Sequence, residues 1–236
     1  MLNLKSLREQ VYQYLREELH RGNILPGDNI NMGKLCKKLN VSKTPLREAL
    51  IFLEAEGFVT ILPRRGVLVN RLTLDDVREL IQVVGSLEAS AVVSAAAKID
   101  KLVLKRLAGL NEKMTAAVHR EDFERYYRLN VEFHDIFLNR CGNKLLRKTV
   151  LLFKQRLYDF PRRAYIMEWE LINCGEHDQI VACLEREDAS GAARIMQDAH
   201  WSYSKHERYI RQFYLNVTHE IQVELATRQR AKLGVG

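Results

Sequence analysis

Residues 41–69 read VSKTPLREALIFLEAEGFVTILPRRGVLV, and they decide the fold of the amino-terminal third of the chain. Four apolar residues follow the i, i+3, i+4, i+7 spacing of a buried helical stripe: Leu46, Ala49, Leu50 and Leu53. Gly57 is typical of a helix end, and the β-rich segments 58–62 and 67–69 flank Pro63-Arg64-Arg65-Gly66, which is a hairpin signal. The stretch therefore predicts a helix followed directly by a β-hairpin.

The residues before this stretch predict two more helices. Ser6 and Glu9 form a capping box before an amphipathic run over about 7–20, and the Pro26-Gly27 pair breaks the chain after it. Asn31 can cap a short second helix. Helix, helix, turn, helix and hairpin make a winged helix-turn-helix, which we expect over residues 1–72.

The strand signals cease after Asn70, and residues 73–213 predict an all-helical bundle. Its helices are expected to begin near Thr73, Asp100, 122, 143, 168 and Asp188. The fourth should end at Pro161, and the last should run without a break to about Phe213. Residues 214–236 predict a tail or a terminal helix with a frayed end. The fold class is therefore mostly α.

The net charge of +7 is concentrated at the amino-terminal end, where residues 1–72 hold 12 Lys and Arg against 7 Asp and Glu. A basic end suggests a polyanion partner, although a solvated basic face has the same composition. The four cysteines are scattered and form no C-x-x-C pair, which indicates a reducing, cytoplasmic location. No apolar run approaches about 18 residues, and the amino terminus lacks the order of a signal peptide, so we expect no membrane span.

Two groups of cations suggest contact with a DNA duplex. Lys43 and Arg47 are four residues apart and share the helix face opposite the leucine stripe, where long donors can reach guanine N7 and O6. Arg64 and Arg65 at the hairpin tip could enter a minor groove, and Gly66 would let the backbone pass close. Taken singly, each group could be a solvated surface; together, after a helix-turn-helix pattern, they favour DNA.

Residues 5–72 resemble the amino-terminal domain of GntR-family transcription regulators, above all in VSKTPLREAL, EGFV and PRRGVLV. The resemblance implies DNA contacts at the residues that match the family motif: Ser42, Lys43, Thr44, Arg47 and Gly66. Lys43 stands where the family usually has arginine, and Lys34 lies beside the position of a further family arginine. One reading head covers only a few base pairs, so we expect a homodimer on a palindromic operator of double-stranded DNA.

The carboxyl-terminal part carries a possible metal site. Asn130 and His134 are four residues apart on one predicted helix and share a face with Tyr126, while His177 and His200 fall on two other helices. Three imidazoles and an amide oxygen from three helices could close around a divalent ion. A buried histidine is more often only a core residue, and that alternative stays open. Cys174 could be an alternative ligand or a small core residue.

Residues 73–213 resemble the FCD ligand-binding domain of the FadR branch of the GntR family, in the N-x-x-F-H, E-H-x-x-I and E-D-A-S-G-A-A-R-I-M-Q-D-A-H segments. The resemblance implies that a divalent metal, zinc or nickel, is held by four residues: Asn130, His134, His177 and His200. It also implies a small organic acid as effector. Val84 stands where members of the branch often carry a carboxylate-binding arginine, so Arg156, Arg162 or Arg163 could replace it, beside Tyr126 in the effector pocket.

These residues support three hypotheses about function. The first is a transcription regulator, not an enzyme, controlled by a carboxylate effector at a metal-containing pocket. The second keeps DNA binding but makes the metal itself the signal. The third is a histidine–metal hydrolase in which Glu176, beside His177, activates water; the absence of an H-E-x-x-H pair argues against it.

Overall fold

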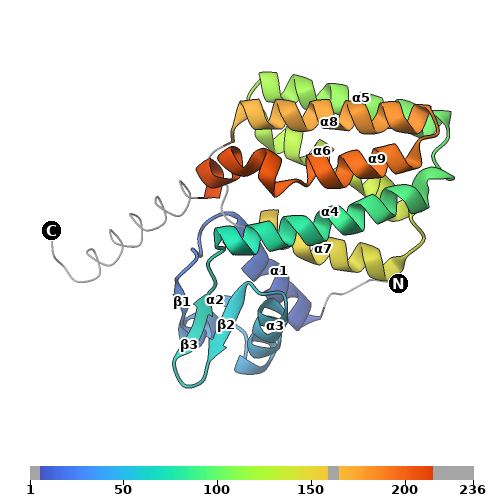
Figure 1. Ribbon diagram of the computed structural model, residues 1–236. Coiled ribbons are helices and arrows are strands. Elements are labelled where there is room, and N and C mark those ends of the chain that lie inside the picture. Colours follow the sequence, from blue (N-terminus) through green and yellow to red (C-terminus); the bar gives the residue numbers. More distant parts are fainter. Residues whose placement is uncertain (1–5, 159–164, 215–236) are drawn as a thin grey trace. The chain divides into compact units, whose positions relative to one another are not determined.

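The computed structural model describes residues 6–158 and 165–214 (Figure 1). The contacts divide the chain into two units. The first comprises Met1–Thr73 with Gln155–Arg163 and Tyr214–Gly236, and the second comprises Leu74–Lys154 and Ala164–Phe213. Each unit is described by itself below.

The first unit is a winged helix-turn-helix, which confirms the predicted fold. Its elements are α1 (Leu7–His20), β1 (Asn29–Ile30), α2 (Met32–Leu39), α3 (Lys43–Ala55), β2 (Val59–Leu62) and β3 (Gly66–Val69). The predicted capping box is present at the start of α1, where the Ser6 hydroxyl and the Glu9 carboxylate each accept from the other residue's backbone N–H. Asn31 caps α2 by accepting from the N–H of Lys34.

The two-residue strand β1 was not predicted. The sheet has the order β1-β3-β2 with antiparallel neighbours, and β1 pairs Asn29 with Leu68. Two backbone hydrogen bonds lead the chain into this position, from Gly27 N–H to the carbonyl of Val69 and from Val69 N–H to the carbonyl of Asp28. A strand of two residues has no room for a hydropathy alternation, so its only cause is pairing with β3.

The core of the first unit lies between α1, α3 and the sheet. The leucine stripe predicted on α3 is fully buried, and it packs with Leu15 of α1 and with Val67 and Val69 of β3. Phe58 closes this core where α3 passes into the hairpin. Burial of the stripe fixes the opposite face of α3 toward solvent, which is the face that carries Lys43 and Arg47.

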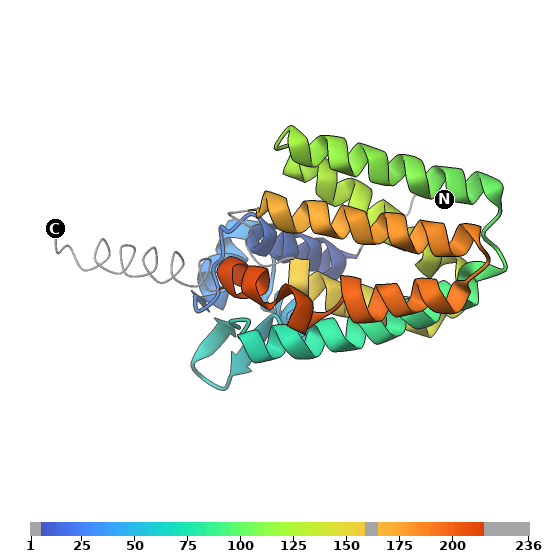
Figure 2. The same ribbon diagram turned by 45° about the horizontal axis from the view of Figure 1, so that its top comes forward.

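The second unit is all helical among the residues that the structure describes. Its elements are α4 (Leu74–Ala96), α5 (Lys101–His119), α6 (Phe123–Arg140), α7 (Lys144–Tyr158), α8 (Met167–Glu185), α9 (Ala189–Ile195), the π-helix η1 (Met196–His200) and a helix over 203–214. The end of α7 from Gln155 on, and Tyr214, group with the first unit. Long helices lie side by side in both views (Figures 1 and 2), with α5 against α6 and α8, and α4 against α6 and α9. The end of the fourth predicted helix, at Pro161, falls outside the described residues.

The prediction of a single helix from Asp188 to Phe213 is wrong in one respect, because the helix is interrupted. Asp188 does cap α9, but η1 follows, and the chain turns at Trp201 before the next helix begins. The turn brings Trp201 so close to α4 that a side chain on Gly85 would lie 2.7 Å from its Cβ. Contact with α4 is a long-range constraint that the local sequence pattern does not carry.

Helix α4 is the one helix among the described residues that is long and apolar enough, by length and composition, to cross a membrane. Half of its apolar window is buried in the unit, including Val84, Ala91 and Val92. The core helix of a bundle can meet the same criteria of length and composition, so they are weak evidence for a membrane span.

Candidate functional site

The residues predicted to contact DNA lie on the surface of the first unit. On α3 and at its start, Ser42, Lys43, Thr44 and Arg47 are exposed, as is Lys34 at the start of α2. Ser42 occupies the amino-terminal cap position of α3, yet its hydroxyl makes no capping hydrogen bond. The hydroxyl and the free N–H groups of the first turn are thus available to a phosphate.

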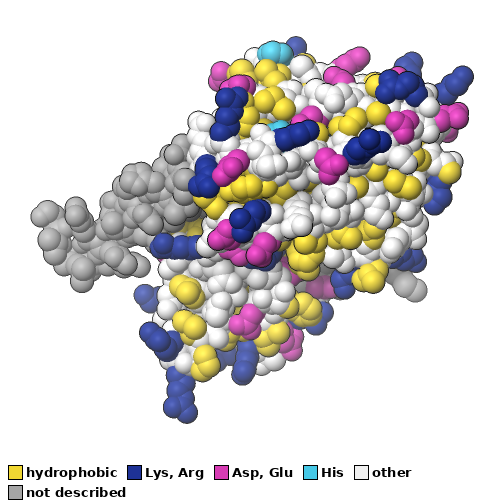
Figure 3. Space-filling view, in the orientation of Figure 1, with side chains coloured by type: hydrophobic (Ala, Val, Ile, Leu, Met, Phe, Trp, Pro, Cys, Tyr) yellow, Lys and Arg dark blue, Asp and Glu magenta, His cyan; other side chains and the backbone are white. Residues whose placement is uncertain are grey.

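The cations of this surface are not held by acidic neighbours. Within residues 6–158 and 165–214, no ion pair joins Lys43, Arg47 or Arg64 to a carboxylate, whereas Arg21 pairs with Glu17 at 3.3 Å. Lys and Arg side chains gather at the end of the first unit that carries the β2–β3 hairpin (Figure 3). An unpaired cation gains more from a phosphate than one already neutralised.

The hairpin tip has a defined conformation. Arg64 has φ +60° and Gly66 has φ +103°, and both Arg64 and Arg65 are exposed. A side chain at Gly66 would lie 2.6 Å from Oδ1 of Asn29, whose Nδ2 donates to the carbonyl of Arg65 at 3.4 Å. The glycine is thus required by the wing itself.

The three predicted histidines meet in the second unit. His134 of α6, His177 of α8 and His200 of η1 each offer a ring nitrogen, and these three atoms lie within 4.8 Å of one another. His134 and His177 are 1% and 0% exposed. Burial lowers the pKa of His134 to about 4 and the pKa of His177 well below its usual value, so both rings are neutral near pH 7 and can act as ligands.

The orientation of His177 is fixed by Asn111. The Nδ2 group of Asn111 donates to the carbonyl of Cys174 at 2.8 Å and to Oδ1 of Asp178 at 2.6 Å, which leaves Oδ1 of Asn111 as an acceptor. Nδ1 of His177 lies 3.2 Å from this oxygen and must therefore carry the proton. Nε2 of His177 keeps its lone pair.

His134 is oriented by a buried carboxylate. Its Nδ1 lies 2.6 Å from Oε2 of Glu88, whose other oxygen accepts from Nζ of Lys154 at 2.7 Å. Burial alone would raise the pKa of Glu88, but His134 and Lys154 lower it, so Glu88 is ionised and acts only as an acceptor. A contact of 2.6 Å with an ionised carboxylate places the proton on Nδ1 of His134, as in His177, although this contact lacks the geometry of an ordinary hydrogen bond.

His200 is oriented in the same way by Glu176. Nδ1 of His200 lies 3.2 Å from Oε2 of Glu176, and Nε2 of His206 lies 3.3 Å from Oε1. Burial alone would raise the pKa of Glu176, but hydrogen bonds from His200 and His206 lower it to about 2. Glu176 thus holds two imidazoles, which is a different role from the activation of water in the hydrolase hypothesis.

The atoms left without partners fit a divalent cation. The buried atoms without a hydrogen-bond partner in the described part of the chain include Nε2 of His134, Nε2 of His177 and Oδ1 of Asn130. Asn130 lies one turn before His134 on the buried face of α6. Buried polar atoms are normally satisfied, and a metal ion is one way to satisfy a convergent set of lone pairs.

Other predicted site residues lie elsewhere. Cys174 is buried in the apolar core and burial raises its pKa to about 11, which favours the core alternative over a thiolate ligand. Tyr126 is buried in the same core, and burial and Glu170 raise its pKa well above the usual value. Arg156 falls in the stretch that groups with the first unit, and Arg162 and Arg163 lie outside the described residues.

Sequence reasoning missed the polar residues around the histidines. Lys154 and Glu88 are 5% and 2% exposed, although each has a full charge. The signal was present in the spacing, since Lys154 follows the buried Val150 by one turn and Glu88 follows the buried Val84 by one turn. A charged residue at a core position of a helix marks a buried polar network.

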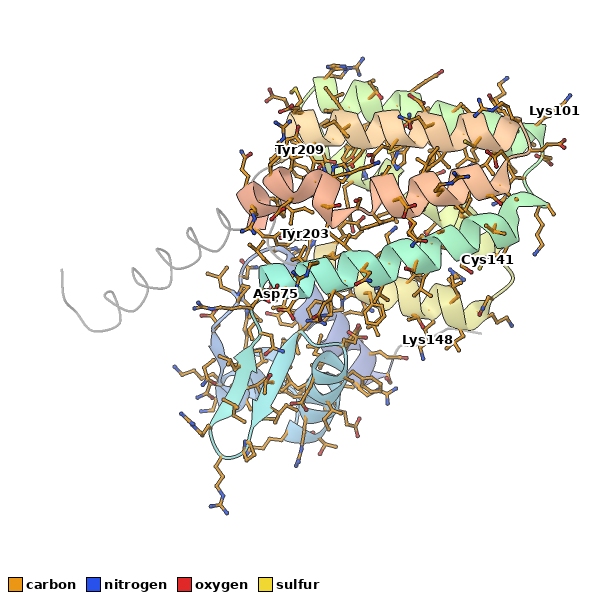
Figure 4. All side chains as sticks on the ribbon, in the orientation of Figure 1. Asp75, Lys101, Cys141, Lys148, Tyr203 and Tyr209 are labelled. Atoms are coloured by element: carbon orange, nitrogen blue, oxygen red, sulfur yellow. The ribbon has the colours of Figure 1, made fainter. Side chains whose placement is uncertain are left out.

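An open pocket of about 490 Å³ lies on the surface of the second unit between the first half of α4 and the segment after η1. Arg78, Gln82 and Ser86 line one side, and Trp201 and Tyr203 line the other. Tyr203 lies opposite the first turns of α4 in Figure 4. Trp201 also contacts the histidine cluster, since its ring centroid is 5.6 Å from that of His200.

Comparison with known protein families gives matches to both units. The model of the bacterial regulatory proteins of the gntR family matches residues 7–69, and the FCD domain model matches residues 79–200, more than half of the chain. The chain belongs to the GntR family. It carries the FCD domain that the resemblance of residues 73–213 implied, so it is a DNA-binding transcription regulator with an effector-binding domain.

Two curated relatives of the chain are named as HTH-type transcriptional regulators. The chain is 33% identical over 140 residues to the uncharacterized HTH-type transcriptional regulator YdhC of Bacillus subtilis, a match that spans 58% of this chain and 62% of that protein. It is 25% identical over 213 residues to the HTH-type transcriptional repressor RspR of Escherichia coli, which spans 88% and 92%. The prediction that this GntR-family chain is a regulator and not an enzyme is confirmed, and the hydrolase alternative is wrong.

The solved structure of E. coli McbR/YncC has the same fold. It superposes with a TM-score of 0.64 over 87% of this chain and 100% of that one, at 24% identity. This likeness confirms the fold class of the GntR-family chain.

Proposed function

We propose that this regulator binds a palindromic operator as a homodimer in the cytoplasm. Lys43 and Arg47 would read bases in the major groove, and Ser42, Thr44 and Lys34 would contact phosphates. Arg64, Arg65 and Gly66 would form the wing contact. The exposure of these side chains and their lack of acidic partners in the described part of the chain support the proposal.

The parts of the chain would have different functions. Residues 1–72 would read DNA, and residues 73–213 would bind the effector and a metal and hold the dimer. The tail or terminal helix expected over residues 214–236 lies, except for Tyr214, outside the described residues. Two reading heads are needed for specificity, and their spacing or orientation is the quantity that an effector can bias.

The metal would be held by Asn130, His134, His177 and His200. The observation that supports this most is the common orientation of the imidazoles, in which each Nδ1 faces an acceptor and the Nε2 atoms of His134 and His177 have no partner among the described residues. Three imidazole ligands favour a borderline divalent ion such as zinc or nickel. Such an ion would offer its remaining coordination positions to the oxygens of a small carboxylate effector.

The test is a mobility-shift assay with a duplex selected by the protein from a random pool. Metal-free protein, zinc-loaded protein and zinc-loaded protein with acetate, benzoate, succinate or citrate would be compared. We expect a change in DNA affinity of about 5- to 150-fold only when zinc and one carboxylate are both present. His177→Ala should bind DNA but lose this response; the same response in His177→Ala would contradict the proposal.

A second candidate is a metal-responsive regulator, in which zinc or nickel alone changes DNA affinity. The three ring nitrogens within 4.8 Å of one another support this candidate, because such a site could bind a metal ion without an effector. The same assay separates the two candidates, since a full change with zinc alone favours the metal as signal.

A further inference from the structure

The proposed metal site has an unusual distribution of charge. Its four candidate ligands are the neutral amide of Asn130 and three imidazoles, two of which burial keeps neutral. A divalent ion among them would be buried without an anion in direct contact. A buried charge without compensation is unfavourable, so the charge must be balanced from farther out or the ion would bind weakly.

Two carboxylates contact candidate ligands at Nδ1, the ring nitrogen that would not bind the metal. Glu88 lies 2.6 Å from Nδ1 of His134, and Glu176 lies 3.2 Å from Nδ1 of His200. A carboxylate that accepts from Nδ1–H makes the opposite nitrogen a stronger donor to a metal. Asn111 has the same position behind His177 but is neutral.

The two carboxylates are not equivalent. Glu88 is balanced by the ammonium of Lys154 at 2.7 Å, and it also accepts from Nε1 of Trp201 at 2.8 Å. Glu176 contacts two imidazoles and has no lysine or arginine partner in the part of the chain that the structure describes. More of its negative charge is therefore available to a cation at the histidines.

We infer that Glu176, with Glu88 in support, is a positioning residue that supplies through His200 and His134 the negative charge that Asn130 does not give directly. This inference rests on the proposed metal site. It makes Glu176 part of the metal-binding apparatus although it would not touch the metal. Its role is to orient His200 and to balance charge.

The inference predicts that a carboxylate placed among the candidate ligands can replace the negative charge of Glu176. Glu176→Gln keeps the size of the side chain but removes the charge, and we expect zinc affinity to fall about 10- to 100-fold. Asn130→Asp places a carboxylate directly among the candidate ligands. If Glu176 supplies charge, Asn130→Asp should raise zinc affinity more in the Glu176→Gln background than in the wild type, whereas a purely structural role of Glu176 would give the same gain in both.

The measurement is a zinc titration of the full chain against a fluorescent chelator at pH 7.5, with thermal unfolding of each metal-free variant as a check on folding. Glu185→Gln, an exposed carboxylate on the same helix, is the control and should bind zinc like wild type. Should Glu176→Gln fail to fold, Glu176→Asp and Glu176→Asn are compared instead, because they are equal in size and only the first keeps the charge; the first should bind zinc about tenfold more tightly than the second.

Each outcome has one meaning. Wild-type zinc affinity in Glu176→Gln, or an equal gain from Asn130→Asp in both backgrounds, overturns the inference while the metal site stands. Equal zinc affinity of Glu176→Asp and Glu176→Asn overturns it as well. If wild-type protein binds no zinc, or His177→Ala binds it equally, the proposed metal site itself is wrong.

Discussion

The indole Nε1 of Trp201 donates a 2.8 Å hydrogen bond to Oε2 of Glu88, the same oxygen that lies 2.6 Å from Nδ1 of His134. One carboxylate oxygen thus joins α4, α6 and the residue after η1. Trp201 also lines the open pocket on the surface of the unit. A molecule in that pocket would contact a residue that is linked to the candidate metal ligand His134 through one carboxylate oxygen.

The closeness of Gly85 to Trp201 gives the first prediction. In Gly85→Ala the new methyl group would lie 2.7 Å from the Cβ of Trp201, so the indole must move away from Glu88. We expect a loss of about 1–3 kcal/mol in thermal unfolding and a red shift of Trp201 fluorescence in a Trp169→Phe background. Gly109→Ala is the control, because nothing lies within 4 Å of its Cβ, and it should be neutral or stabilising.

Arg47→Ala should weaken binding to the selected duplex by about 1–3 kcal/mol, or roughly 10- to 100-fold, because a bidentate contact to guanine would be lost. Its side chain is exposed, so the free energy of unfolding should not change. The measurement is a mobility shift at fixed salt. Arg21→Ala, whose cation is already paired with Glu17, should bind nearly as well as wild type. Equal affinity of Arg47→Ala and wild type would count against α3 as the reading helix.

Arg64→Ala should reduce the salt dependence of DNA binding. If the wing neutralises a phosphate, the slope of log K against log salt should become shallower by about 0.9. Fluorescence anisotropy at several salt concentrations measures this slope. Arg120→Ala, an exposed arginine of the second unit, should leave it unchanged. An unaltered slope in Arg64→Ala would show that the wing does not contact the backbone.

Leu53→Ala should destabilise the first unit by about 2–5 kcal/mol, because Leu53 is fully buried between α3 and the sheet and its removal leaves a cavity. Urea denaturation measures the change. Ile51→Ala on the same helix is the control, since Ile51 is 47% exposed and its loss should cost little. A comparable loss in both variants would contradict the packing of α3.

The histidines predict a pH dependence of the metal-free protein. Burial lowers the pKa of His134 from 6.5 to about 4, so the unfolded chain binds a proton more readily than the folded one between these values. The resulting stability is complete above about pH 6.5 and should be lost as the pH falls toward 4, by on the order of 2–3 kcal/mol. Denaturation at several pH values tests this. His134→Gln should flatten the profile, and His119→Gln, an exposed histidine, should not.

Much of this molecule could be predicted from local sequence patterns. The helix of the first unit that carries Lys43 and Arg47 was predicted because its leucine stripe fixes which face is buried. The meeting of His134, His177 and His200 was predicted through the resemblance to the FCD domain, since their spacing in the sequence carries little information.

The rest depends on contacts between distant residues. Strand β1 exists only because β3 pairs with it, and the break at Trp201 exists because α4 approaches that turn. The roles of Glu88, Glu176 and Lys154 depend on which neighbours the fold supplies to each charge. A pattern of single-helix periodicity cannot assign these partners.

The widened turn of η1 has a consequence for how the chain tolerates changes in length. Deleting the exposed Gln197 would let the turn close to the ordinary 3.6 residues and would leave the segment after it in nearly the same helical phase, because the π-turn holds one residue more than an α-turn. Inserting one more residue there would instead rotate His200 and Trp201 by about 100° away from their partners, although neither had been substituted. The histidine cluster is therefore encoded by the residue count of this segment as much as by its side chains.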